Sequence, residues 1–380
     1  MDVEEKVEIV KNIAAEIITE DDLRILFETK ESPIAYDGFE PSGFAHLPFG
    51  IYRPLIIREL QKAGIRFKLL LADSFAWINN KLGGDLEKIR TVGKYFIEVW
   101  KKAFEIFGAN EEKVEFIWHK DHFDDPEYWR KVIIIAKCHT LRRTKRALTI
   151  AGRIAGDSQP TAFFFYPSMQ CADIFHMNID ICQLGLDQRR VNVLAREIAK
   201  SKYQGIPIPK IFGYTGGCNG VPVAIHHRLL PGLGKPEKIL EYDDSKEISL
   251  KITLKMSKSR PETCIFIHDS REEIFKKVRR AFCPPQSKIE INGVLFENPV
   301  LVYTREIVFR IRGKIEIKDK IYDDFKELVR DYDEGKIHPL DLKMALADEL
   351  DKIIAPLRKH FEKGKGKELY RVVKEYQISR

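Results

Sequence analysis

The sequence lacks the cysteine spacing that metal and redox sites use. Its six cysteines are scattered along 380 residues, and no two of them form a CxxC pair. A cysteine-based zinc site and a disulfide framework both depend on regularly spaced cysteines, so neither is indicated. We expect reduced, mostly buried thiols, as in a cytosolic protein.

Long apolar runs are lacking as well. Residues 1–6 are acidic and carry no apolar targeting core, and no later apolar run is long enough to span a bilayer. Neither sign of charge dominates, because 64 basic and 57 acidic residues leave a net charge of +7. Such a modest excess permits a polyanionic partner without requiring one. The expected location is the cytoplasm.

The pattern that is present is an alternation of apolar strand segments with amphipathic helix segments. Strands are expected at residues 34–36, 67–72, 114–118, 179–182 and 222–226, and helices at 55–63, 89–107, 129–152 and 190–200. This alternation predicts an α/β fold with a Rossmann-like, doubly wound, mostly parallel sheet. Ligands of such sheets bind at the carboxyl ends of the strands.

The chain is expected to have three regions. Residues 1–30 have helical spacing and predict a helical preface of two helices. Residues 31–271 would form the sheet domain, with a helical insertion at about residues 120–165. Residues 272–380 combine helical patterns with basic clusters, which predicts a separate, mostly α-helical C-terminal domain.

One segment carries two lysines three residues apart, interleaved with two serines: Lys255-Met256-Ser257-Lys258-Ser259. Both ammonium groups can point at one polyphosphate, and the serine hydroxyls favour a turn and add short donors. A solvated basic loop would look the same in a chain with 64 basic residues. If the segment is a site, its chemistry suits a leaving pyrophosphate.

A glycine-rich segment far upstream forms the second half of this pattern. Gly38 lets the backbone approach a ligand, and His46 lies near an expected helix start, where it can donate to a phosphate oxygen. An ordinary proline turn would explain the same residues, and the pairing with the lysine segment favours a nucleotide site. Pro48 suits a first helical turn, whereas Pro54 must either kink the helix or mark its beginning.

Polar residues also recur at helical spacing near the middle of the chain. Tyr166, Gln170 and Asp173 are separated by four and three residues and therefore share one helix face. Such a face usually meets solvent, but this one is embedded among apolar neighbours, which favours a binding pocket. Gly185 and Asp187 follow an expected strand, where a glycine and hydrogen-bonding groups suit the ribose of ATP.

Together these segments resemble a known family. Residues 255–259 match the KMSKS signature of class I aminoacyl-tRNA synthetases letter for letter, and His46-Leu47-Pro48-Phe49 resembles a degenerate HIGH signature. Segments 35–43, 169–175, 180–189 and 338–343 are similar, in order, to tyrosyl-tRNA synthetases of the archaeal and eukaryotic cytosolic type. The resemblance implies a tyrosine–tRNA ligase, which activates tyrosine with ATP to tyrosyl-adenylate and pyrophosphate and then transfers tyrosine to the 3′ end of tRNA(Tyr).

The resemblance also implies roles for matching positions. The tyrosine-binding set would be Tyr36 and Asp173 at the phenol hydroxyl, with Tyr166, Gln170 and Gln188 at the amino end. The ATP-binding set would be Gly38, His46, Gly185, Asp187, Lys255, Met256, Ser257, Lys258 and Ser259, of which His46, Lys255 and Lys258 would be catalytic. The tRNA-binding set would be Arg146 and Arg189 at the acceptor stem, with His338 and Asp341 at the first anticodon base.

Further expectations follow from the same resemblance. Mg²⁺ would accompany ATP without a dedicated protein site, and the 120–165 insertion would form a homodimer. A tryptophanyl-tRNA synthetase shares the fold and signatures, but an indole N–H has no need of the Tyr36 hydroxyl beside Asp173. A catalytically impaired, RNA-binding paralogue is the other alternative, motivated by Pro48 and Pro54. Asp341 would equally suit a helix N-terminus after a proline turn.

Overall fold

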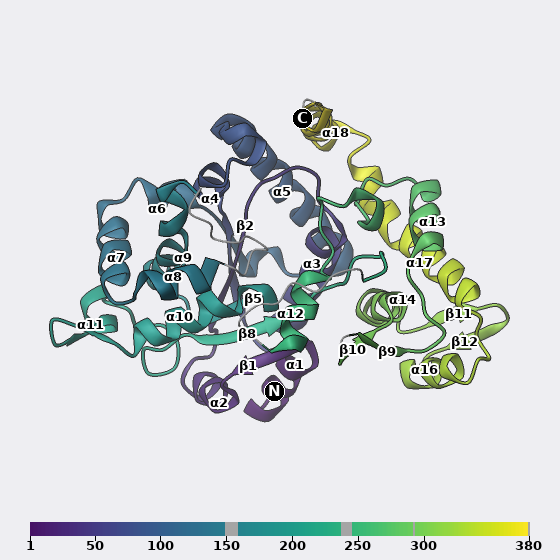
Figure 1. Cartoon of the computed structure of the whole chain (residues 1–380), viewed down its shortest axis with the longest axis horizontal. Helices are drawn as coiled ribbons and strands as arrows, with labels where there is room; N and C mark the ends of the chain where they lie inside the picture. Colours follow the sequence, from purple (N-terminus) through teal and green to yellow (C-terminus); the bar gives the residue numbers. More distant parts are fainter. Residues whose placement is uncertain (149–158, 237–244, 292, 379–380) are drawn as a thin grey trace. The chain divides into compact units, whose positions relative to one another are not determined.

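The computed structural model describes residues 1–148, 159–236, 245–291 and 293–378 (Figure 1). The chain forms two compact units, each assembled from three separate segments. Unit 1 comprises residues 1–43, 56–97 and 110–228, and unit 2 comprises residues 44–55, 98–109 and 229–380. The domain boundary expected at residue 272 stays a prediction.

Unit 1 is built on a six-stranded sheet with the strand order β1-β8-β5-β2-β3-β4. Its strands are β1 (Ala14–Ile18), β2 (Ile34–Phe39), β3 (Arg66–Leu71), β4 (Val114–Trp118), β5 (Ile181–Gly185) and β8 (Val223–His227). All neighbours pair in parallel except β1, which runs antiparallel to β8 at one edge. Every residue of β5 and β8 is buried, as expected for strands of a parallel sheet covered on both faces.

Helices follow the strands as the alternation predicted, which confirms the α/β class and the Rossmann-like sheet. The helices up to the last sheet strand are α1 (Val3–Ile13), α2 (Glu20–Thr29), α3 (Arg53–Lys62), α4 (Asp73–Ile78), α5 (Leu86–Phe107), α6 (His119–Phe123), α7 (Pro126–Lys137), α8 (Leu141–Leu148), α9 (Tyr166–His176), α10 (Arg189–Ala199) and α11 (Ile208–Phe212). A short hairpin precedes α11, and its strands, β6 (Lys202–Tyr203) and β7 (Ile206–Pro207), have two residues each. Figure 1 shows α7 to α11 gathered on one side of the sheet.

The N-terminal preface contains a strand that its sequence did not indicate. Helices α1 and α2 are the two expected helices, but residues Ala14–Ile18 between them are extended and pair with β8. Five residues are too few to show a clear alternation of apolar and polar positions. The strand exists because β8, more than 200 residues away in the chain, offers it a partner.

The helix expected over residues 129–152 is interrupted. Helix α7 ends at a cap on Cys138, and α8 begins after Thr140, whose hydroxyl accepts a hydrogen bond from the Arg143 N–H at 3.2 Å. A threonine hydroxyl that satisfies the first turn of a new helix competes with continuation of the old one. Residues 149–152 of the expected helix lie outside the described residues.

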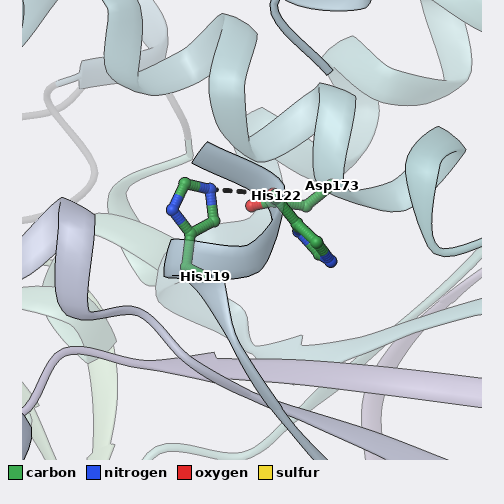
Figure 2. A group of neighbouring side chains, drawn as sticks. All are labelled: His119, His122 and Asp173. Carbon is green, nitrogen blue, oxygen red and sulfur yellow. Dashed lines mark hydrogen bonds and ion pairs between the residues drawn. The ribbon is translucent and has the colours of Figure 1, made fainter. Parts of the chain in front are cut away.

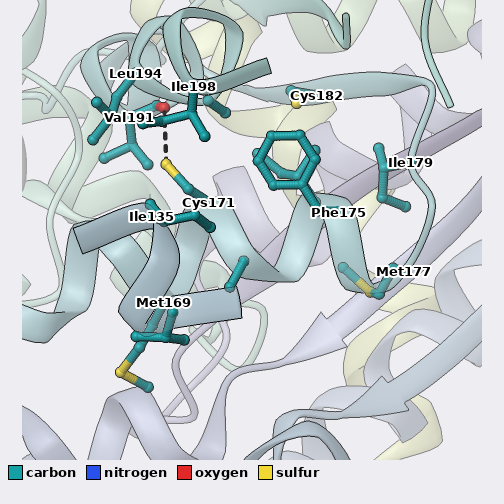
Figure 3. Close-up of a cluster of buried hydrophobic side chains, with 14 of the residues drawn as sticks. Ile135, Met169, Cys171, Phe175, Met177, Ile179, Cys182, Val191, Leu194 and Ile198 are labelled. Carbon is teal, nitrogen blue, oxygen red and sulfur yellow. Dashed lines mark hydrogen bonds between the residues drawn. The ribbon is translucent and has the colours of Figure 1, made fainter. Parts of the chain in front are cut away.

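Helix α9 lies at the centre of the core of unit 1. Figure 3 shows its Met169, Cys171 and Phe175 packed among side chains from α7, α10 and β5. The Cys171 thiol also donates to the Val191 carbonyl at 3.8 Å, and all six cysteines are free thiols, as expected. Burying a large apolar side chain contributes about 1.5–3 kcal/mol. Packing therefore fixes the helix that also carries the predicted polar residues.

Unit 2 contains the C-terminal helices and two short hairpins. Its helices are α12 (Lys246–Thr253), α13 (Arg271–Arg280), α14 (Pro299–Tyr303), α15 (Arg310–Arg312), α16 (Phe325–Asp333), α17 (Pro339–His360) and α18 (Gly364–Ile378). The hairpins are β9 (Lys288–Ile291) with β10 (Val294–Glu297), and β11 (Ile315–Ile317) with β12 (Lys320–Tyr322). The mostly helical character was predicted, but strands of three or four residues carry no readable period. None of the helices in the described ranges has both the length and the apolar character needed to cross a membrane.

Candidate active site

Helix α9 presents the three predicted polar side chains on one face. The Tyr166 hydroxyl donates to Glu40 Oε1 at 2.8 Å, and Gln170 Nε2 donates to Gln188 Oε1 at 3.3 Å. Asp173 is 1% exposed, two turns further along the helix. The spacing of four and three residues therefore predicted the common orientation of these side chains, and other residues of unit 1 are hydrogen-bond partners of Tyr166 and Gln170.

Tyr36 of β2 meets Asp173 in the interior of unit 1. Its side chain is 1% exposed, and burial, with the neighbouring Cys182 and Asp173, raises its pKa well above the usual value. Within the described part of the chain, Tyr36 Oη, Gln170 Oε1 and Asp173 Oδ2 are buried without a hydrogen-bond partner. Buried polar atoms are nearly always paired in folded proteins, so three unpaired ones together indicate a ligand site.

Two histidines of α6 lie against Asp173, and the sequence analysis did not single them out. Asp173 Oδ1 is 3.1 Å from His119 Nε2 and 3.4 Å from His122 Nδ1 (Figure 2). Burial alone would raise the pKa of Asp173, but the two imidazoles bring it below its usual value. The His-x-x-His spacing was a visible signal, but nothing local linked it to a carboxylate about 50 residues away.

In unit 2, His46 lies directly before a helix, as expected. The backbone on either side of it is held by the neighbouring chain, with Leu47 N–H donating to the Ile265 carbonyl at 2.8 Å and Ile267 N–H donating to the Ala45 carbonyl at 3.1 Å. The His46 carbonyl accepts from the next turn, whose N-terminal residue is Pro48. His46 therefore sits at the start of a helical segment.

The question raised by Pro54 is resolved by a π-helical turn. Residues Pro48–Tyr52 form this wider turn, and α3 continues from Arg53 with Pro54 as its second residue. The wider turn makes room for a proline ring that would otherwise clash with the carbonyl four residues earlier. Gly50 lies in the same turn, where a β-carbon would come within 2.6 Å of Ile267, so the close approach requires glycine.

The lysine segment is anchored at its centre. Met256 is 4% exposed, its N–H donates to the Leu230 carbonyl at 2.8 Å, and its sulfur lies 3.8 Å from the Tyr303 hydroxyl. Ser257 and Ser259 share a hydrogen bond of 2.8 Å between their hydroxyl oxygens. The buried Met256 therefore fixes the segment between two partly exposed lysines.

His46 and the lysine segment act on one another electrostatically within unit 2. Burial, followed by the ammonium groups of Lys258 and Lys255, lowers the pKa of His46 well below its usual value. Its Nδ1 atom is buried and has no partner among the described residues. His46 is therefore neutral near pH 7, and the two signatures, more than 200 residues apart in sequence, are neighbours in space.

Three of the predicted ATP-binding residues lie at the carboxyl ends of adjacent strands of unit 1. Gly38 is near the end of β2, Gly185 ends β5, and Asp187 is in the turn that follows. A β-carbon at Gly38 would only touch Leu70 at 3.8 Å, so the protein itself does not require glycine there. Their position agrees with the expected crevice of a doubly wound sheet, and their roles stay predictions.

The predicted RNA-binding residues divide between the units. In unit 1, Arg146 is exposed on α8, and Arg189 Nε donates to the Glu16 carboxylate of β1 at 2.9 and 3.0 Å. In unit 2, His338 caps α17 by accepting from the Leu340 N–H at 3.2 Å. Asp341 lies in the first turn of α17 and pairs with Lys318 at 2.7 Å, so the helix N-terminal role is realised.

Comparison with known proteins identifies the family. The family model described as tRNA synthetases class I (W and Y) matches residues 28–355. The tyrosine–tRNA ligase of Thermococcus sibiricus is 42% identical, over 100% of both chains. The cytoplasmic tyrosine–tRNA ligase 1 of Arabidopsis thaliana is 37% identical, over 100% of this chain and 90% of that one.

A solved structure is similar over the same length. Tyrosyl-tRNA synthetase from Pyrococcus horikoshii, complexed with L-tyrosine, is 38% identical, with a TM-score of 0.85 and coverage of 99% of this chain and 100% of that chain. Sequence and structure thus agree from end to end. The chain belongs to the tyrosyl-tRNA synthetase family of class I aminoacyl-tRNA synthetases.

Proposed function

We propose that this chain is a tyrosine–tRNA ligase: it joins tyrosine and ATP into tyrosyl-adenylate and pyrophosphate, then transfers tyrosine to the 3′ end of tRNA(Tyr). One observation carries the proposal, namely the buried and unpaired Tyr36 Oη, Gln170 Oε1 and Asp173 Oδ2. Each unpaired group costs about 1–3 kcal/mol, so a polar ligand is expected there. The curated relatives named above are tyrosine–tRNA ligases, which favours tyrosine over tryptophan.

Tyr36 and Asp173 supply the two kinds of group that a phenol hydroxyl needs. The substrate hydroxyl donates to Asp173 and accepts from Tyr36, which stays protonated because its pKa is raised. Phenylalanine would leave both groups unpaired, a penalty on the order of several kcal/mol that discriminates without editing. The proposed partners of the substrate amino group are Tyr166, Gln170 and Gln188, of which Gln170 has an unpaired acceptor oxygen.

The proposed ATP-binding residues are divided between the two units. In unit 2, His46, neutral and able to donate, is the proposed contact of a phosphate, and in unit 1 Gly38, Gly185 and Asp187 are proposed ATP-binding residues. Met256, Ser257 and Ser259 shape the segment around the polyphosphate. Mg²⁺ is proposed to accompany ATP through its phosphate oxygens, since Mg²⁺ prefers oxygen ligands.

The chemistry needs no protein nucleophile. An oxygen of the tyrosine carboxylate attacks the α-phosphorus of ATP and forms a new oxygen–phosphorus bond. The bond from the α-phosphorus to the oxygen that bridges to the β-phosphorus breaks, and pyrophosphate leaves. Lys255 and Lys258 stabilise the negative charge that accumulates on the leaving pyrophosphate. Holding both reactants in line supplies the remaining acceleration.

A hollow in unit 2 supports the proposed anticodon contact. It has a volume of about 580 Å³, and its charged lining is balanced: Lys318, Lys320, Arg330 and Lys336 are matched by Asp319, Glu327, Asp331 and Asp341. The basic side chains can contact RNA phosphates, and the Asp341 carboxylate can accept from the N–H groups of a guanine. His338 lies beside it at the cap of α17, and Arg146 and Arg189 are the proposed acceptor-stem contacts.

The proposed homodimer uses the insertion of unit 1. Three large apolar side chains of that region are exposed: Ile133 at 48%, Leu141 at 61% and Phe165 at 38%. All three lie within residues 120–165 of the sequence, and exposed apolar side chains are typical of an interaction surface. Ile133→Glu is expected to convert a dimer to a monomer in analytical ultracentrifugation. A cytoplasmic location is proposed because the Arabidopsis relative is named as cytoplasmic.

Exchange of labelled pyrophosphate into ATP tests the function. Tyrosine is expected to support exchange and tryptophan is not, while phenylalanine is expected to support it with a much lower kcat/KM. The protein is then expected to charge tRNA(Tyr). Asp173→Asn should lower kcat/KM for tyrosine at least tenfold. Asp124→Asn is the matched control, because that carboxylate lies in the same insertion and pairs with Lys120 at the surface. Exchange with tryptophan alone, or with no amino acid, would contradict the proposal.

A further inference from the structure

The two oxygens of Asp173 have different surroundings. Oδ1 lies 3.1 Å from His119 Nε2 and 3.4 Å from His122 Nδ1, and all three side chains are buried. Figure 2 shows both imidazoles, which come from α6, next to this carboxylate. Oδ2 is buried without a partner among the described residues. The protein therefore occupies one oxygen and leaves the other for a ligand.

The hydrogen-bond directions identify His119 as a donor. The Tyr128 hydroxyl has one proton, and both the Met169 carbonyl, at 3.0 Å, and the Asp173 carboxylate are acceptors for it. With that proton on either acceptor, the Tyr128 oxygen, 2.9 Å from His119 Nε2, accepts from that nitrogen. His119 Nε2 therefore carries a hydrogen, which is shared between Tyr128 and Asp173.

This assignment also bears on a metal ion. His119, His122 and Asp173 have the residue types of a metal centre, with candidate ligand atoms within 4.8 Å of one another. A metal ligand must offer a lone pair, but the Nε2 lone pair of His119 is replaced by the hydrogen that Tyr128 requires. Hydrogen bonding to the carboxylate explains the same geometry without an ion.

Aromatic packing holds both imidazoles in place. The His119 ring lies 4.5 Å from Phe75 and 5.3 Å from Tyr128, measured between ring centroids. The His122 ring lies 5.7 Å from Tyr128 and 4.8 Å from His176. Rings packed in this way cannot swing away from Asp173 without opening the core. The carboxylate plane is thereby fixed.

We propose that His119 and His122 are specificity-determining positioning residues, which hold Asp173 by Oδ1 so that Oδ2 is the acceptor for the hydroxyl of tyrosine. This inference rests on the proposed function and extends it to side chains that do not touch the substrate themselves. A carboxylate that is free to rotate could turn either oxygen toward a neighbouring donor, and Oδ2 would no longer be held toward the substrate hydroxyl. Fixed by two donors, it presents one acceptor in one direction.

The same arrangement explains why a buried carboxylate can select for a hydroxyl. Burial opposes ionisation of Asp173, and the two imidazoles more than offset it, so its pKa lies below the usual value. An ionised acceptor makes the stronger, charge-assisted hydrogen bond to the phenol. Phenylalanine offers no donor and leaves Oδ2 charged, buried and unpaired.

The test compares two classes of substitution at each histidine. His119→Phe and His122→Phe keep an aromatic ring but remove the donor, whereas His119→Gln and His122→Asn restore an N–H near the original nitrogen. Pyrophosphate exchange is measured with tyrosine and with phenylalanine. His119→Phe and His122→Phe are expected to lower kcat/KM for the substrate tyrosine at least tenfold. Their kcat/KM for phenylalanine as substrate is expected to change little. The amide variants are expected to recover most of the loss.

The outcomes separate this inference from its alternatives. If the histidines had only a structural role, the substitutions would lower exchange with both amino acids and raise KM for ATP. The ratio of kcat/KM for tyrosine to kcat/KM for phenylalanine would then stay unchanged, and that result would overturn the inference. His176→Phe is the matched control, because His176 packs on His122 and pairs with Lys131 and Asp125 instead of bonding to Asp173.

Three further results would also overturn it. One zinc ion per chain by mass spectrometry, with tyrosine exchange lost on chelation and restored by zinc, would make these residues a metal centre. An unsubstituted protein without tyrosine-dependent exchange would remove the proposed function itself. An active protein whose variants keep the full selectivity would remove only the role of the histidines.

Discussion

Replacing Tyr36 with phenylalanine should change stability and activity in opposite directions. The Tyr36 hydroxyl is buried and has no partner among the described residues, in a side chain that is 1% exposed. A buried, unpaired hydroxyl costs about 1–3 kcal/mol, and its removal leaves a gap of only one atom. We therefore expect Tyr36→Phe to raise the free energy of unfolding by about 1 kcal/mol, or about 1 °C in melting temperature for a chain of 380 residues.

The same change should weaken recognition of tyrosine. The substrate oxygen would lose the donor supplied by Tyr36 but keep its bond to Asp173. A neutral hydrogen bond contributes about 1 kcal/mol, which corresponds to a loss of about fivefold in kcat/KM for tyrosine. Exchange with phenylalanine should be unaffected, so the selectivity for tyrosine falls by about the same factor.

Tyr214→Phe provides the matched comparison. Tyr214 is also a buried tyrosine of unit 1, but its hydroxyl donates to the Ile179 carbonyl at 2.5 Å. Removing a satisfied donor should destabilise the protein by about 1–3 kcal/mol and leave selectivity unchanged. Thermal and denaturant unfolding, with exchange kinetics on the same samples, measure both effects. If Tyr36→Phe loses as much stability as Tyr214→Phe, the hydroxyl was satisfied and the argument for a substrate hydroxyl at this place fails.

Three further predictions follow from unit 2. Lys258→Ala should lower kcat for pyrophosphate exchange about 100-fold with little change in KM for tyrosine, because the ammonium group that stabilises the leaving pyrophosphate is lost. Lys251→Ala, which only breaks a surface pair with Glu247, should change neither value. Equal effects of the two substitutions in stopped-flow measurements would contradict the assignment. Burial, and then the Arg358 guanidinium, lowers the pKa of His268 to about 3, so between pH 6.5 and 3 the unfolded chain binds a proton that the folded chain does not, and stability falls as pH falls. The variant His268→Phe keeps an aromatic ring against Tyr370. Between pH 7 and 5 its free energy of unfolding should fall by about 1–2 kcal/mol less than that of the unsubstituted protein. Equal decreases for the two proteins in urea titrations would refute this. Asp341→Ala should lower charging of tRNA(Tyr) tenfold or more while exchange without tRNA persists, and undiminished charging in a filter assay would exclude the anticodon role.

The active-site residues on α9 could be predicted because their signal is local. Tyr166, Gln170 and Asp173 share a face through the pitch of one helix, and the lysine segment is a contiguous run of five residues. Helical pitch and chain continuity are properties that neighbouring residues carry among themselves. No distant part of the chain is needed to infer them.

Other features depend on partners far away in the sequence. His119 and His122 have no local sign of Asp173, and the acidic partner of Arg189 is Glu16, on a strand that no periodicity indicated. That strand forms because the order β1-β8-β5 brings the N-terminal segment beside residues 223–227. Strand order is a property of the whole sheet, so it is invisible to any short window.

For this chain, the amino-acid sequence alone was sufficient to predict the α/β class, the two nucleotide signatures and the polar face of α9. Each of these features depends on the spacing of residues within a few helical turns or a short segment. Folding decided which oxygen of Asp173 is occupied, which side chain pairs with Arg189, and how a π-helical turn accommodates Pro54. The physical reason is that hydrogen bonds and packing form between groups at contact distance, and only the folded chain brings residues separated by 50 to 200 positions to that distance.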